Sequence, residues 1–91
     1  EPKESYIWGT RGELYYHIHE YESCISDMTK AIELEENRET KADSDDPGVP
    51  FYFRGLSEIH LGRRVEGCKD LEKALELGMS EAIDYLSKYC K

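Results

Sequence analysis

Hydrophobic residues along this chain recur every three or four positions, which is the spacing of amphipathic helices. Trp8, Gly12 and Tyr15 fall on one face of a segment that runs from about residue 5 to 18. A second stripe follows the interruption at His19-Glu20, and its members are Tyr21, Cys24, Ile25, Met28, Ala31 and Ile32. The pattern therefore predicts a pair of helices in the first third of the chain.

The same pattern returns 43 residues later, because residues 11–34 align with residues 54–77 without a gap. Eight aligned positions are identical, and they are Arg11/Arg54, Gly12/Gly55, His17/His60, Asp27/Asp70, Lys30/Lys73, Ala31/Ala74, Glu33/Glu76 and Leu34/Leu77. Self-similarity at such a period is typical of stacked supersecondary units. We therefore expect a second helix pair, broken at Gly62 and ended at Gly78 by a left-handed C-cap.

Two further segments complete the predicted organisation. The acidic stretch at about residues 35–47 reads as an insertion between the pairs, and Pro50 fits only near the start of the next helix. Ser80 is the expected N-cap of a fifth helix over residues 80–90, whose apolar side carries Ala82, Ile83, Leu86, Tyr89 and Cys90. This helix has no following partner, so we expect it to cover the end of the array.

These residues resemble the tetratricopeptide repeat family. The resemblance lies in Arg11-Gly12, Tyr15-Tyr16, Glu20-Tyr21-Glu22, Ile25, Asp27 and Lys30-Ala31-Ile32-Glu33-Leu34, and again in Arg54-Gly55, Leu61-Gly62, Asp70 and Lys73-Ala74-Leu75-Glu76-Leu77. It implies one all-α domain over residues 1–91, a right-handed α-α superhelix of two antiparallel helix pairs and a capping helix. Repeat one covers about residues 5–35, and repeat two about residues 48–78. The 43-residue step then implies an insertion of about nine residues into the usual repeat of about 34.

The second copy departs from the family pattern at two positions. Glu58 stands where the first copy has Tyr15, and Arg64 stands where it has Tyr21. We expect Val65 to supply the contact that the second of these changes removes.

Resemblance to this family also implies a concave groove, lined by the first helix of each pair, that binds peptide segments of partner proteins. Spacing along those helices predicts a groove wall made of Glu13, Tyr16, His17, Tyr52, Leu56, Ile59 and His60. The alternative is that the fifth helix folds over this wall, which would make Tyr52, Leu56 and Ile59 core residues. Some family members clamp a chaperone C-terminus with Lys, Arg and Asn, but the matching wall here offers none of the Lys or Asn residues.

Two arginine–aspartate pairs recur at the same 16-residue spacing, Arg11 with Asp27 and Arg54 with Asp70. We expect each pair to form a bidentate ion pair between the two helices of its unit. The alternative is two separate surface charges, which contribute ~0–1 kcal/mol. An arginine-bound carboxylate is in either case a poor general base.

Catalytic and metal-binding signals are weak. His17, His19 and Cys24, or His60 and Cys68, suggest zinc, but His17 and His19 point about 200° apart on a helix and no C-x-x-C pair occurs. Neither a G-x-S-x-G elbow nor a glycine-rich phosphate loop is present. We therefore predict a non-enzymatic protein-binding scaffold with no cofactor. Two alternatives stay open: a purely structural or self-associating C-terminal end of a longer array, and a metal or redox element.

Charge and cysteine content restrict the partners and the compartment. The chain has 12 Lys and Arg against 20 Asp and Glu, a formal net charge of −8. This balance argues against nucleic acid or an anionic membrane, and favours either a basic ligand or simply a solvated acidic surface. No apolar run is long enough to span a bilayer. Three cysteines, an odd number, predict no disulfide framework and favour a reducing compartment such as the cytoplasm.

Overall fold

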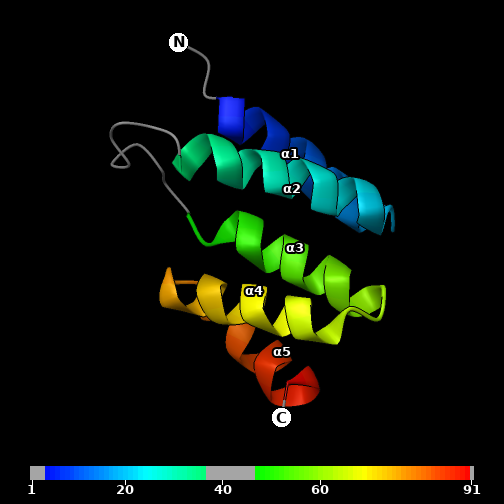
Figure 1. Ribbon diagram of the computed structural model, residues 1–91, viewed down its shortest axis with the longest axis vertical. Coiled ribbons are helices and arrows are strands. Elements are labelled where there is room, and N and C mark those ends of the chain that lie inside the picture. The colour runs from blue at the N-terminus through cyan, green and yellow to red at the C-terminus, as the bar shows by residue number, and fades with distance from the viewer. Residues whose placement is uncertain (1–3, 37–46, 91) are drawn as a thin grey trace.

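The computed structural model describes residues 4–36 and 47–90, and these residues form five α-helices packed one after another (Figure 1). The helices are α1 (Glu4–His17), α2 (Tyr21–Glu36), α3 (Val49–His60), α4 (Arg64–Glu76) and α5 (Ala82–Tyr89). Each helix packs against the next one along the chain. The all-α fold expected from the hydrophobic pattern is therefore confirmed, and most of the expected insertion, residues 37–46, lies outside the described residues.

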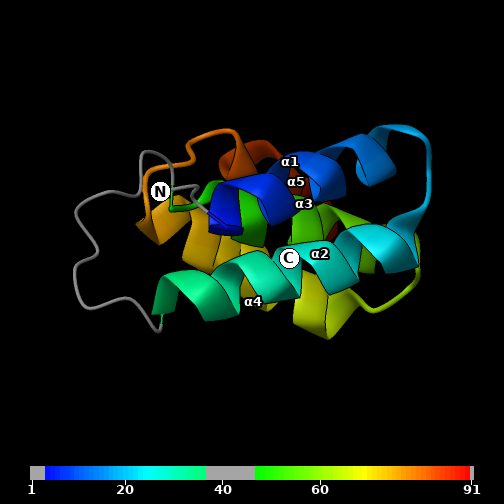
Figure 2. The ribbon, with the colours of Figure 1, turned by 90° about the horizontal axis from the view of Figure 1, so that it is seen from above.

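The five helices lie on two sides of the molecule. Figure 2 shows α1, α3 and α5 toward one side and α2 and α4 toward the other. The first helix of the first pair, α1, therefore lies beside the first helix of the second pair, α3. A surface that combines side chains of α1, α3 and α5 can form only through this arrangement.

The turns within the two helix pairs are the same turn. His19 has a φ of 66° and Gly62, its counterpart 43 residues later, has a φ of 82°. Both lie in the left-handed region, which costs a non-glycine residue free energy. The backbone bonds also match, since Glu20 N donates to Tyr15 O and Arg63 N to Glu58 O, each at 2.8 Å. The repeat in the sequence is therefore a repeat in backbone geometry.

The core continues from one helix pair into the next. In the first pair, Cys24, Met28, Ala31 and Ile32 of α2 are buried. A second buried cluster joins α3, α4 and α5 through Leu56, Leu71, Ala74 and Ala82. These residues occupy the predicted apolar stripes, and their burial is what holds helices of eight to sixteen residues in place.

Two local expectations are wrong. The fifth helix begins at Ala82 after Glu81, and no side chain caps it, because Ser80 lies in the preceding turn and bonds to Gly78 O through its backbone nitrogen. Val65 is 66% exposed in the first turn of α4, so it supplies no core contact. Gly78 does stop the fourth helix, with a φ of 106°.

The cysteines also differ from expectation. Cys68 of α4 and Cys90, which directly follows α5, form a disulfide that spans 22 residues of sequence, while Cys24 is free and buried. The prediction that no disulfide forms is wrong, because pairing depends on how α5 lies against α4 and not on sequence spacing. Because two of the three cysteines are paired, the cysteine content no longer favours a reducing compartment. Within the described ranges, no helix is long and apolar enough to cross a membrane.

Candidate functional site

Both recurring arginine–aspartate pairs are present and bidentate. Arg11 donates to the two carboxylate oxygens of Asp27 at 2.7 and 3.0 Å, and Arg54 donates to those of Asp70 at 2.7 and 2.9 Å. Both aspartates are buried. Arg54 also donates to Thr29 Oγ1 of α2 at 3.1 Å, which links the two helix pairs. These hydrogen bonds raise the pKa of both guanidinium groups, so the pairs are structural ties between helices.

Glu58 is a buried acid beside the second ion pair. Burial, followed by the hydrogen bond to Asp70, raises the pKa of its carboxyl group to about 8. Its Oε1 atom and the hydroxyl of neighbouring Ser57 have no hydrogen-bond partner among the described residues. Glu58 therefore carries a proton at neutral pH and belongs to the interior between α3 and α4.

The predicted groove residues fall into three groups. Leu56 is only 3% exposed and lies in the core, so its assignment to an open groove wall is wrong. Tyr16, Tyr52 and Ile59 are half-buried and pack against the core cluster. Glu13, His17 and His60 lie further out, with His17 and His60 exposed and the Glu13 carboxylate 3.7 Å from His17 Nε2.

Aromatic rings form a continuous series across these positions. Ring centroids 4.5 to 6.3 Å apart connect His19, Tyr21, His60, Tyr16, Phe53, Tyr52, Tyr85 and Tyr89 in that order, and His17 lies beside Tyr16 and Phe53. We call these nine residues the aromatic row. The closest pair is Tyr21 with His60, whose rings stack at 4.5 Å. The row contains all three histidines of the chain and joins α1, α2, α3 and α5.

Five members of this row were absent from the predicted groove wall: His19, Tyr21, Phe53, Tyr85 and Tyr89. Tyr85 and Tyr89 were missed because α5 was treated as a cap that covers the array. The structure gives α5 a second role, since its Tyr85 ring meets Tyr52 edge-on at 5.9 Å and extends the row. The spacing of Ala82, Tyr85 and Tyr89 on one side of α5 is the sequence signal that could have found them.

The phenol groups at the centre of the row stay uncharged. Burial raises the pKa of Tyr16 and of Tyr52 to about 12, and the hydrogen bond between Tyr52 and Tyr85 contributes to the second shift. Both hydroxyls are therefore neutral at physiological pH. Neutral phenols at the edge of a core combine an apolar ring with a group that can donate or accept a hydrogen bond.

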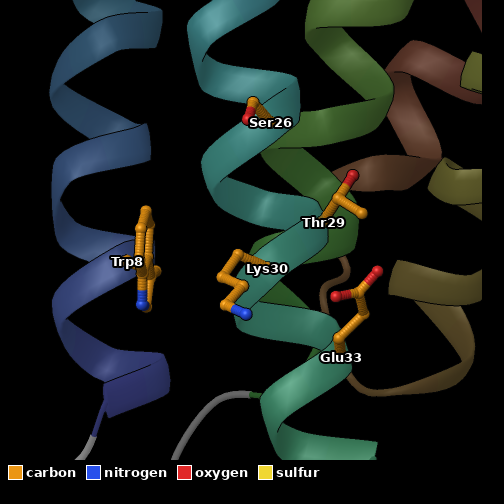
Figure 3. Close-up of a pocket in the computed structure, with 5 residues that line it drawn as sticks. All are labelled: Trp8, Ser26, Thr29, Lys30 and Glu33. Carbon is orange, nitrogen blue, oxygen red and sulfur yellow. The ribbon is translucent and has the colours of Figure 1, made fainter.

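A separate shallow hollow lies between α1 and α2. Its volume is about 370 Å³, and it is lined by Trp8, Ser26, Thr29, Lys30 and Glu33 (Figure 3). Only Trp8 comes from α1, and its ring already holds the Arg11 guanidinium 4.8 Å from its centroid. The hollow offers mostly solvated side chains of one helix, so it is a weaker candidate than the aromatic row.

The geometry defines the class of protein: a small all-α domain of five helices. In the part of the chain that the structure describes, no group of three or more His, Cys, Asp or Glu side chains is placed to hold a metal ion. Comparison of the chain with protein-family models, with curated proteins and with solved structures gives no match.

Proposed function

We propose that this chain is a tetratricopeptide-like, non-enzymatic interaction module that binds a peptide segment of a partner protein. Its two helix pairs and last helix would then form a short right-handed superhelix. The sequence resemblance supports this fold, and so do the matching turns at His19 and Gly62 and the matching ion pairs of Arg11 and Arg54.

The aromatic row is the observation that carries the proposal. It gathers rings from α1, α3 and α5, the three helices that lie toward one side of the molecule (Figure 2). Tyrosines that are half-buried offer a large apolar area at a low cost in side-chain entropy, together with hydroxyls for orientation. Protein-binding surfaces are enriched in such residues, whereas a purely structural surface has no need of them.

Partial burial supports a different assignment for each of these residues, to the groove or to the core. Leu56 belongs to the core, but Tyr52 keeps part of its surface in water even though α5 packs beside it. His60 is exposed while its ring stacks on Tyr21. We therefore assign binding to Tyr16, His17, Tyr52, Ile59 and His60, extended by Tyr85 of α5.

Selection of binding peptides from a random library tests this proposal, with the isolated ligands then measured against two double variants. Tyr52→Ala with His60→Ala is expected to abolish binding while the protein still melts cooperatively. The matched control is Lys30→Ala with Glu33→Ala, in the shallow hollow between α1 and α2, and it is expected to bind as the wild type does. Peptides that bind both variants equally well, or a selection that yields no ligand, would contradict the proposal.

A second candidate function is structural, and the exposed side of α1 favours it. Ile7 and Leu14 of α1 share one stripe with Ile18, the residue directly after this helix, and the three are 56%, 61% and 64% exposed. The equivalent side of α3 packs on α2, where Ser57, the counterpart of Leu14, is completely buried. Under this second proposal, α1 receives another helix, in a longer array or in a second copy of the chain. A mass in solution that rises with protein concentration would support self-association.

A further inference from the structure

Carboxylates stand beside the aromatic row at two places. Glu13 approaches His17 on α1, and its carboxylate is half-buried there. Glu81, immediately before α5, is close enough to Tyr52 to contribute to the raised pKa of that phenol. An acid of α1 therefore lies beside His17, whose ring centroid is 5.6 Å from that of Tyr16, and an acid at the start of α5 lies near Tyr52.

The arginines of the same helices do not neutralise these acids. Arg11 of α1 is engaged by Asp27, and Arg54 of α3 is engaged by Asp70, both on the second helix of their pair. Arg63 pairs with Glu22 at the surface. Lys88 of α5 lies at the far end of the row, over the ring of Tyr89. With a net charge of −8 on the whole chain, the potential at Tyr16 and Tyr52 favours a cation.

Two other aromatic rings of this chain, one of them at the end of the row, already hold cations. The Arg54 guanidinium lies 5.5 Å from the centroid of Phe51, and the Lys88 ammonium lies 5.3 Å from that of Tyr89. Such contacts are attractive because the face of the ring carries partial negative charge. Tyr16 and Tyr52 are half-buried, and neither has a side-chain cation over its ring in any contact that the structure describes.

We infer that the partner of this surface is a basic peptide segment, whose arginine side chains stack on Tyr16, Tyr52 and Tyr85 between Glu13 and Glu81. Arginine fits better than lysine because its planar group stacks on a ring while its edge donates hydrogen bonds to carboxylates. This inference rests on the proposed function and specifies the chemistry of the partner.

Three synthetic peptides of one glycine–serine sequence test the charge requirement. One carries arginines, one carries citrulline at the same positions, and one carries glutamate. Citrulline keeps the shape and planarity of arginine but has no charge. We expect the arginine peptide to bind about tenfold or more tightly than the citrulline peptide in fluorescence anisotropy. Equal binding of these two peptides would overturn the inference.

Matched variants separate a built site from a diffuse negative surface. Glu13→Gln with Glu81→Gln removes the two carboxylates beside the row, and Glu33→Gln with Glu72→Gln removes two exposed ones on α2 and α4. We expect the first pair to weaken binding of the arginine peptide by about fivefold or more, and the second pair by less than about twofold. Equal losses in both double variants would overturn the inference.

Failure of the inference can be told apart from failure of the proposed function. If library peptides without basic residues bind as tightly as the arginine peptide, and lose binding in the Tyr52→Ala, His60→Ala variant, the peptide-binding function stands and the basic partner is wrong. If neither the arginine peptide nor any library peptide binds, both are wrong.

Discussion

Glu58 is the residue at which this chain departs most clearly from its own repeat. The position holds Tyr15 in the first helix pair and a buried carboxyl group in the second. Arg54 donates to Asp70 and Thr29. Burial raises the pKa of Glu58, and the hydrogen bond to Asp70 and the nearby acid Glu66 add to this rise. Above the pH at which this carboxyl group ionises in water, the folded protein has to keep it protonated, and this lowers the free energy of unfolding.

Replacement of Glu58 by glutamine is expected to stabilise the protein. In the unfolded chain the carboxyl group ionises near 4.5, whereas in the folded chain its pKa is about 8. The folded state binds the extra proton between these values, so wild-type stability falls as pH rises from about 4.5 to 8. Glu58→Gln removes this loss, and we expect a gain of ~1–3 kcal/mol at pH 7. Urea unfolding between pH 5 and pH 8 measures it.

The control for this prediction is Glu72→Gln, which changes an exposed glutamate of the adjacent helix. It should leave both the stability and its pH dependence as in the wild type. If Glu58→Gln loses as much stability between pH 5 and pH 8 as the wild type does, another group is responsible.

At the scale of the elements, glycines set how closely α3 and α4 approach. A Cβ atom at Gly67 would lie 2.6 Å from Ile59 Cγ1 and 2.8 Å from Gly55 O. A Cβ atom at Gly55 would in turn lie 2.9 Å from Gly67 O. Two glycines therefore face each other where the helix backbones meet, and this contact outweighs the ~1 kcal/mol that each glycine costs within a helix.

A pair of glycine-to-alanine variants tests this packing. Gly67→Ala forces the backbones apart, and we expect a loss of ~1–3 kcal/mol in unfolding free energy. Gly9→Ala in α1 meets nothing within 4 Å, so it is expected to be neutral or to stabilise the protein by up to ~1 kcal/mol through helix propensity. Thermal or urea unfolding measures both. Similar stabilities of the two variants would show that the close approach does not matter.

The last helix depends on the disulfide. An eight-residue helix is marginal by itself, and α5 is held by Ala82, by Tyr85 and Leu86 against the core, and by the bond from Cys90 to Cys68. In the chain-entropy description, a loop of this size stabilises the folded state by about 3 kcal/mol. We expect Cys90→Ser to lose up to that amount, and to lose hydrogen-exchange protection first in α5.

A reductant is the control for the disulfide prediction. It should reproduce the effect in the wild type and add nothing in Cys90→Ser. Protection of α5 that stays at the wild-type level in both conditions would mean that packing alone holds this helix.

At the scale of the whole molecule, the exposed stripe on α1 and the negative charge act against each other. Apolar side chains more than half exposed favour association, while a net charge of −8 opposes it at low salt. We expect the average mass in analytical ultracentrifugation to rise with protein concentration, and to rise further when salt screens the charge.

Leu14→Glu places a charge in the centre of the stripe and is expected to remove this association. Val65→Glu is the matched control, because Val65 is as exposed as Leu14 but lies alone on α4. Equal loss of association in both variants would mean that added charge, and not the stripe, is what matters.

The sequence by itself determined which residues form helices, where the turns fall, and which arginine meets which aspartate. These features depend on the spacing of residues along the chain. The 43-residue repeat contains the same spacing twice, and each copy forms a helix pair. The groove wall was only partly predictable, because helical spacing identifies Tyr16 and Tyr52 as neighbours of an inner surface but does not say how deeply each side chain is buried.

Only the tertiary structure decided how α5 lies against α4 and α3. That placement pairs Cys68 with Cys90, buries Leu56, and adds Tyr85 and Tyr89 to the aromatic row. It also decided the proton on Glu58, since a pKa depends on the solvent and charges that folding removes or brings near. The physical reason is the same in each case: periodicity along a chain specifies the face of a helix, whereas contacts between distant helices specify what that face meets.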